Sequence, residues 1–264
     1  MDGCIFLEEL TVDDPTRRFT GRADAYASYR PSYPVEVLRI VEEECGLTPA
    51  SVVADVGSGT GKLAELFLRN GNRVDCVEPN PGMRAVAEAE LGHDPLFVSI
   101  AGRAEQTTLP DRSVDLVVAG QAFHWFDPVP TRAEFERILR PPRSVALIWN
   151  VRRTDTTPFL RSYESFLRTY GTDYAPKRHG RADPATLKAF FGAAGFRKRS
   201  IEHFDTLDLD GLKGRVLSAS YTPAPGAPGH ETMTVALEEL FHAHREDGVV
   251  RFTLDTEIYS GRLS

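Results

Sequence analysis

The segment Asp55-Val56-Gly57-Ser58-Gly59-Thr60-Gly61-Lys62, called the glycine loop below, decides the fold class of this chain. It follows the β-rich apolar run 51–56 and precedes a helical pattern over 61–70, so it joins a strand to a helix. Sheets of the α/β type bind ligands at such turns. Glycines there permit positive φ and a close backbone approach, and the helix start offers free N–H groups. We therefore expect the glycine loop to bind a ligand.

The spacing of the glycines argues against a phosphate-binding P-loop. Such a loop needs four residues between its first glycine and Gly-Lys, followed by Ser or Thr, whereas three residues separate Gly57 from Gly61 and Leu63 follows Lys62. The dinucleotide fingerprint G-x-G-x-x-G would require glycine where Lys62 stands, which weakens that alternative and leaves it open. Asp55 before the loop disfavours a phosphate and favours a cationic or amine-bearing ligand.

Short apolar runs alternate with helical patterns on both sides of the glycine loop. The expected strands are residues 51–56, 73–77, 96–100, 114–119 and 144–149, with two later strands at 199–207 and 249–259. Strands buried on both faces and separated by helices form parallel sheets with right-handed crossovers. We therefore predict an α/β fold with a seven-stranded, mostly parallel, doubly wound sheet; periodicity does not place the last two strands.

Helical patterns fill the intervals and dominate the second half of the chain. The expected helices are residues 35–44, 61–70, 81–91, 131–139, 158–170, 184–194, 212–220 and 232–244. Thr131 is expected to cap the fourth of these, with Glu134 at the capping-box position. We expect one domain over residues 19–264, in which insertions at about 151–195 and 209–248 form a helical cap. Residues 1–18 would precede it as a disordered lead or a lid.

The second expected strand ends in the sequence Val77-Glu78-Pro79-Asn80. An acidic residue at this position is placed to accept hydrogen bonds from the hydroxyls of a ribose. Asp55 and Glu78 together therefore indicate a ligand that carries both a positive charge and a diol.

These residues resemble the signature of class I S-adenosylmethionine (SAM)-dependent methyltransferases, V-x-D-x-G-x-G-x-G followed by an acidic residue at the end of strand two. Over residues 19–263 the chain resembles the methyltransferase-11-like, trans-aconitate-methyltransferase-like group. The motifs that carry this resemblance are Tyr26-x-x-Tyr29-Arg30-Pro31, Gly102-x-Ala104-Glu105, Gln121-Ala122-Phe123-His124-Trp125-Phe126-Asp127, Leu139-Arg140-Pro141, Trp149-Asn150, Ser218-x-Ser220-Tyr221 and Tyr259-x-Gly261-Arg262-Leu263.

The resemblance implies a SAM site at the ends of the first four strands. The glycine loop would lie along the methionine part of SAM, Asp55 would hold its amino group, and Glu78 would bind the ribose hydroxyls. Ala104 and Glu105 would flank the adenine, although Arg103 stands where related proteins often carry an Asp. The implied cofactor-binding residues are Tyr26, Arg30, Asp55, Gly57, Ser58, Gly59, Gly61, Glu78, Pro79, Asn80, Ala104, Glu105 and Gln121.

His124 is the residue best placed to act as a general base. The sulfonium already activates the methyl group, so the protein mainly aligns the reactants, and a base is needed only when the acceptor must lose a proton. Neutral imidazole accepts a proton near pH 7. The aromatic run Ala122-Phe123-His124-Trp125-Phe126 favours a structural or cofactor-shaping role for His124 over a catalytic one.

Composition and charge exclude several other classes of protein. The net charge of −7 disfavours a nucleic-acid partner. No apolar run approaches the ~20 residues that span a bilayer, and the three cysteines lack a C-x-x-C pair, as in a cytoplasmic protein with reduced thiols. His242 and His244 stand two positions apart, which does not put them on one helix face, so no metal site is expected.

We therefore expect an enzyme that transfers the SAM methyl group to a small molecule, at oxygen. Two alternatives remain at this point: an NAD(P)-dependent oxidoreductase on a related sheet, and a SAM-binding regulatory protein without turnover.

Overall fold

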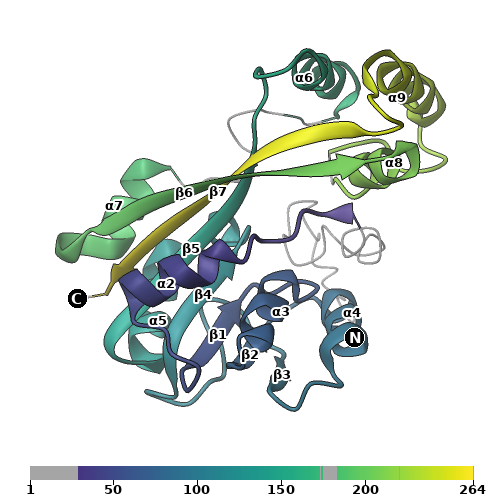
Figure 1. Ribbon diagram of the computed structural model, residues 1–264. Helices are drawn as coiled ribbons and strands as arrows, with labels where there is room; N and C mark the ends of the chain where they lie inside the picture. The colour runs from purple at the N-terminus through teal and green to yellow at the C-terminus, as the bar shows by residue number, and fades with distance from the viewer. Residues whose placement is uncertain (1–28, 173, 175–182, 220, 264) are drawn as a thin grey trace, which may run out of the picture.

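The computed structural model describes residues 29–172, 174, 183–219 and 221–263. In this part of the chain a 7-stranded sheet has the strand order β3-β2-β1-β4-β5-β7-β6 (Figure 1). The strands are β1 Val52–Val56, β2 Arg73–Val77, β3 Phe97–Ile100, β4 Val114–Gly120, β5 Leu139–Arg152, β6 Phe196–Leu207 and β7 Val250–Arg262.

The pairing confirms the predicted mostly parallel sheet and places the two strands that periodicity left unplaced. β1 pairs in parallel with β2 and β4, and the outer pairs β2·β3 and β4·β5 are also parallel. β7 lies between β5 and β6 and runs antiparallel to both. The carboxyl ends of β1, β2, β4 and β5 therefore meet at one edge of the sheet, where α/β proteins bind their ligands.

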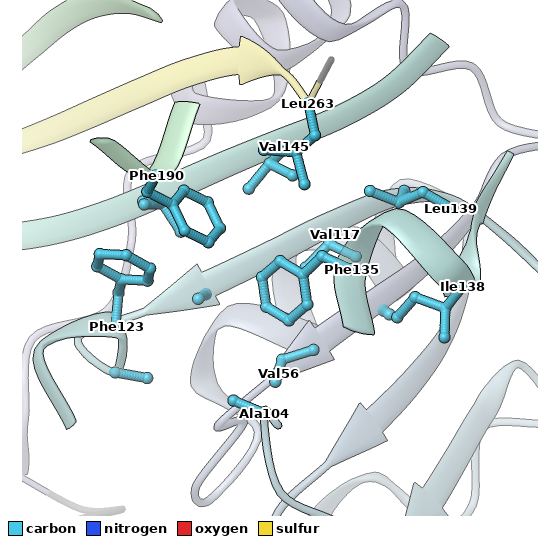
Figure 2. Packing of buried hydrophobic residues seen from close by; sticks show 14 of the residues in the cluster. Val56, Ala104, Val117, Phe123, Phe135, Ile138, Leu139, Val145, Phe190 and Leu263 are labelled. Carbon is cyan, nitrogen blue, oxygen red and sulfur yellow. The ribbon is translucent and has the colours of Figure 1, made fainter. Parts of the chain in front are cut away.

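Helices cover both faces of the sheet. They are α2 Glu36–Cys45, α3 Lys62–Arg69, α4 Pro81–Leu91, α5 Pro128–Ile138, α6 Pro158–Tyr170, α7 Pro184–Phe191, α8 Leu209–Leu217 and α9 His230–His244, with 3-10 turns at η1 Phe123–Trp125 and η2 Gly192–Ala194. Alternate β5 residues serve the two cores: Trp149 packs on the face of α5 and α7, and Ile148 on the face of α2 and α3. Figure 2 shows Phe135 of α5 and Phe190 of α7 in the first of these cores.

A third apolar cluster, called the cap core below, is built by α6, α8, α9 and the first half of β7. Its members include Tyr163, Leu212, Leu237 and Phe252. Figure 1 shows these three helices grouped at the far end of the long strands β6 and β7. The expected insertion 151–195 divides between two places, because α6 enters the cap core whereas α7 covers the sheet.

The position of α7 follows from its aromatic residues. The ring centroid of Phe190 lies 4.6 Å from that of Phe123 and 6.0 Å from that of Phe135, both in edge-to-face contact. Phe191 is fully buried in the same cluster. Edge-to-face aromatic pairs add stabilisation beyond the burial of their surface, so this helix belongs to the sheet core and not to the cap.

The start of α5 corrects the expected cap at Thr131. The helix begins at Pro128, and the Asp127 side chain accepts a hydrogen bond from the Val129 amide at 3.2 Å. An Asp-Pro pair supplies both a preferred N-cap residue and a preferred first helical residue, so it outcompetes the later threonine. Thr131 lies inside the helix, and Glu134 accepts hydrogen bonds from the amide and hydroxyl of Thr107 instead of closing a capping box.

We expect the substitution Glu134→Gln to lower the free energy of unfolding at pH 7 by about 1–3 kcal/mol, as measured by urea titration. Burial by itself raises the pKa of Glu134, but hydrogen bonds from Arg137 and Thr107 outweigh it and hold the pKa below its usual value. The folded state therefore binds the proton more weakly than the unfolded state. The wild-type protein should lose this stabilisation as the pH falls below about 4.3.

The matched control is Glu136→Gln, because Glu136 pairs with Arg132 at a more exposed point of the same helix. Its expected effect is below about 0.5 kcal/mol. Equal losses of stability in the two variants would contradict the stabilising role of Glu134. So would a decrease in stability below about pH 4.3 that is the same in Glu134→Gln as in the wild type.

Candidate active site

The glycine loop follows β1 at the carboxyl edge of the sheet. Gly57, Gly59 and Gly61 have φ of 71°, 57° and 81°, a conformation that costs other residues energy. A Cβ on Gly57 would lie 2.6 Å from Cβ of Ala122, and one on Gly61 would lie 2.5 Å from Cδ1 of Leu91. A Cβ on Gly59 would meet nothing within 4 Å. Gly57 and Gly61 therefore permit close packing, whereas Gly59 borders open space.

Glu78 joins the ends of β1 and β2. Its Oε2 accepts a hydrogen bond from the Gly59 amide at 3.0 Å, and its Oε1 accepts one from the Asn80 amide at 2.8 Å. Burial raises the pKa of Glu78, while these two amides and Arg84 act in the opposite direction. The side chain of Asn80 caps α4 by accepting hydrogen bonds from the amides of Gly82 and Met83.

Asp55 carries a buried carboxyl group beside this loop. The residue is fully buried, and neither carboxyl oxygen has a partner at hydrogen-bond geometry among the described residues. Burial, with a smaller contribution from the charge of Glu78, raises the pKa of Asp55 to about 7, against a lowering effect of the Ala64 amide. An unpaired buried carboxylate is costly, and a bound cation offsets that cost. These features fit the amino group of SAM.

The loop after β4 forms the next wall of the site. Gln121 stands in the left-handed region with φ of 56°, and its Nε2 donates a hydrogen bond to the carbonyl oxygen of Asn150 at 2.9 Å. Ala122 and Phe126 lie against Gly57, as the close approach to its absent Cβ shows. Strained backbone of this kind is tolerated where the surroundings fix it and is frequent at functional sites.

The loop after β3 is tied to the loop after β4. The Asp127 amide donates a hydrogen bond to Oε1 of Glu105 at 2.9 Å. Ala104 is buried in the core on the face of α5 and α7, and Figure 2 shows it beside Val56 at the end of β1. The contacts therefore bring the predicted residues of these loops together at one edge of the sheet.

The remaining predicted residues have different surroundings. Half-buried His124 lies in η1, with its ring centroid 4.8 Å from that of Trp125. Arg30 donates a hydrogen bond from Nη2 to the carbonyl oxygen of Ser218 at 3.3 Å, which places it against the cap side of the molecule. Tyr26 and residues 1–18 lie outside the described residues.

A polar chain that the sequence did not reveal connects the sheet to the segment before α2. Nδ2 of Asn150 donates to the carbonyl oxygen of Ser32 at 3.1 Å, and Oδ1 of Asn150 accepts from the hydroxyl of Thr256 at 2.6 Å. Nε2 of His203 lies 2.9 Å from the same hydroxyl. The only sequence signal was a polar residue within an apolar strand, and Thr256 is fully buried.

The described part of the chain shows no metal centre and no membrane-spanning helix. No group of three or more His, Cys, Asp and Glu side chains there is arranged to hold a metal ion. None of the helices described has both the length and the apolar character needed to cross a bilayer. Cys45 and Cys76 are free thiols.

Comparisons with known proteins agree with this geometry. A family model described as a methyltransferase domain matches residues 54–146. The uncharacterized methyltransferase Rv3342 of Mycobacterium tuberculosis is 40% identical over 210 residues, which cover 79% of each chain. The uncharacterized methyltransferase-like C25B8.10 of Schizosaccharomyces pombe is 31% identical over 149 residues, covering 56% of this chain and 57% of that protein.

Solved structures share the fold. A candidate type II methyltransferase from Anaeromyxobacter dehalogenans superposes with a TM-score of 0.65 at 24% identity, covering 89% of this chain and 99% of that one. The YcgJ protein of Bacillus subtilis superposes with a TM-score of 0.53 at 19% identity, over 86% and 97% of the two chains. With the identity and coverage of the mycobacterial relative, these findings show that the chain belongs to the SAM-dependent methyltransferase family and has the class I methyltransferase fold.

Proposed function

We propose that this enzyme transfers a methyl group to an oxygen atom of a small-molecule acceptor at the carboxyl edge of β1, β2, β4 and β5. The observation that carries the site is the buried carboxyl group of Asp55, which has no hydrogen-bond partner in the described part of the chain and lies beside a glycine loop fixed by Glu78. Methylation at oxygen is supported by a stretch of 95 residues that is 32% identical to the malonyl-[acyl-carrier protein] O-methyltransferase of Serratia marcescens, over 35% of this chain and 36% of that protein. The net charge of −7 favours a small molecule over a nucleic acid.

In this proposal the residues around the glycine loop hold SAM. Asp55 pairs with the amino group, and the amide-rich loop follows the methionine part. Glu78 binds the ribose hydroxyls: its oxygens accept from two amides, and a carboxylate has about four acceptor positions, so capacity for the diol remains. The other proposed contacts come from Arg30, Pro79, Asn80, Ala104, Glu105 and Gln121, together with Tyr26 outside the described residues.

Catalysis in this site rests on alignment and exclusion of water. SAM, when bound, supplies a methyl group already activated by a positively charged sulfonium. Hydrogen bonds from backbone amides to the carboxylates of Glu78 and Glu105 join the loops after β1 and β2 and those after β3 and β4, and close packing at Gly57 joins the loops after β1 and β4, so the wall of the site is fixed before the ligands bind. Alignment of this kind is worth about 7–11 kcal/mol in favourable cases. His124 accepts a proton in the cases where the acceptor is a hydroxyl.

Membership of the methyltransferase family overturns the oxidoreductase alternative. The remaining question is turnover, and it is tested by incubating the protein with methyl-labelled SAM and cell extract and identifying labelled products by mass. We expect a labelled small molecule with a new O-methyl group. Label confined to macromolecules, or on nitrogen or carbon, would contradict the proposal. SAM binding without any labelled product would instead support a regulatory role.

Asp55→Asn should weaken SAM binding by about tenfold to a hundredfold, because it removes the charged partner of the amino group. The pKa of Asp55 in the free protein is about 7, so binding of the cation must release a proton below that pH. We therefore expect the wild-type affinity for SAM to fall as the pH drops below about 7, and the Asn variant to lose this dependence. Isothermal titration calorimetry at several pH values measures both effects.

Methylthioadenosine is the matched control ligand for Asp55→Asn, because it contains the nucleoside and sulfur but no amino acid part. Its affinity should be equal in the two proteins. The ligand-free variant should also unfold at a higher temperature than the wild type above pH 7, because a buried unpaired charge is removed. Equal weakening of both ligands would contradict the assignment of Asp55 to the amino group.

His124→Gln should leave SAM affinity within about a few-fold and slow transfer to a hydroxyl acceptor by about a hundredfold or more, because a general base contributes 10²–10⁴-fold. Single-turnover rates across a range of pH measure the effect. His93→Gln is the control, since His93 lies exposed at the end of α4. Turnover of the His124 variant that equals the control at every pH would remove the base assignment.

A further inference from the structure

Three arginines lie close to Tyr163 and Phe252 of the cap core. We call Arg30, Arg152 and Arg215 the arginine cluster. Cζ of Arg152 lies 5.0 Å from the ring centroid of Tyr163, and Cζ of Arg215 lies 5.6 Å from that of Phe252. The rings of Tyr163 and Phe252 are themselves in edge-to-face contact at 5.0 Å.

The entry segment before α2 reaches the same place. Nε of Arg215 donates a hydrogen bond to the carbonyl oxygen of Tyr29, and the ring of Tyr29 lies against Gly214 of α8 so closely that a Cβ there would overlap it. Burial raises the pKa of Tyr163, whereas the positive charges of Arg152, Arg215 and Arg30 act to lower it. All three guanidinium groups therefore lie within electrostatic reach of one buried tyrosine.

Arg152 lies on the part of β5 that extends past the end of β4. β4 ends at Gly120, opposite Ile148, whereas β5 continues to Arg152 and so projects past the carboxyl edge of its neighbour. Asn150, whose carbonyl oxygen receives the Gln121 side chain, points to the same face of β5 as Arg152 because strand side chains alternate. Two strand residues span about 7 Å, so the backbone of Arg152 lies about that far along β5 from Asn150, which binds the side chain of Gln121.

The guanidinium of Arg152 is only partly used by the protein. Its Nη2 donates to Oε2 of Glu164 at 2.6 Å and to the hydroxyl of Tyr174 at 3.1 Å. Its Nη1 is buried and has no hydrogen-bond partner among the residues that the structure describes. Glu164 also forms an ion pair with Arg168, with an N–O distance of 3.2 Å, so its single negative charge is shared between two arginines. A buried donor without a partner is costly, and an anion at Nη1 would satisfy it.

We infer that Arg152 anchors an anionic group of the acceptor, so that the substrate is a small acid carrying a separate oxygen nucleophile. The rings of Tyr163 and Tyr174 beside this guanidinium, with Tyr221 packed against Tyr174, suit an acid with an apolar body. The anchored group is distinct from the methylated oxygen, because charge-assisted hydrogen bonds to a guanidinium withdraw electron density from a carboxylate and weaken it as a nucleophile. This inference rests on the proposed function and deepens it.

The test measures thermal stabilisation of the full chain saturated with S-adenosylhomocysteine. The probes are para-hydroxybenzoate, malate and inorganic phosphate, with neutral para-hydroxybenzamide as the ligand control. We expect the carboxylates to stabilise the wild type and the amide to have no effect. The apparent affinity should fall by about tenfold to a hundredfold in Arg152→Gln and Arg152→Lys, since lysine keeps the charge and loses the planar fork.

Arg153→Gln is the matched variant control, because the neighbouring Arg153 pairs with Asp255 and Glu202 and not with the arginine cluster. Unchanged binding of S-adenosylhomocysteine verifies that each variant is folded. An Arg152-dependent response to phosphate alone would assign the anchor to a phosphate ester instead of a carboxylate. Equal stabilisation of the wild type and Arg152→Gln, or none by any anion, would overturn the inference. If the wild type does not bind S-adenosylhomocysteine, the proposed function is overturned instead.

Discussion

The hydrogen bonds from the amides of Gly59 and Asn80 to the buried carboxylate of Glu78 hold the candidate site together. They fix the turn after β1 to the turn after β2, so neither loop is free to adjust when a ligand arrives. The missing side chain of Gly57 then lets Ala122 approach from the loop after β4. Three loops that are distant in sequence thus become one rigid wall, and preorganisation of this kind reduces the entropic cost of binding.

Glu78 holds the loops in place, whereas the buried carboxyl group of Asp55 lowers the stability of the ligand-free protein. A fully buried carboxyl group with no hydrogen-bond partner among the described residues destabilises the ligand-free protein, and its pKa of about 7 reflects that cost. Because no described residue forms a hydrogen bond with this carboxyl group, the position suits a cationic ligand. At the proposed site, the sequence of this turn therefore favours ligand binding at the expense of stability.

The first five strands were predictable because each is a short apolar run bounded by turn residues, and α4 follows the prediction at both ends because Asn80 and Pro81 form a strong start signal. The order of β6 and β7 was not predictable, because the insertion of β7 between β5 and β6 gives no recognisable pattern in the sequence of either strand. The predicted helix start at Thr131 was wrong because the stronger start signal, the Asp127–Pro128 pair, precedes it. The hydrogen bond between Asn150 and Thr256 joins residues 106 positions apart, and such a pair is invisible without the sheet register.

One face of β7 separates the core under α2 and α3 from the cap core. Ile258 on that face belongs to the core under α2 and α3, and Leu254 belongs to the cap core. Thr256 between them binds the polar side chain of Asn150. A polar break between two apolar cores means that the cap has its own packing, so its residues can change without disturbing the loops around Glu78. The long strands β5, β6 and β7 carry that cap beyond the edge of β4, and Arg152 stands on the overhang.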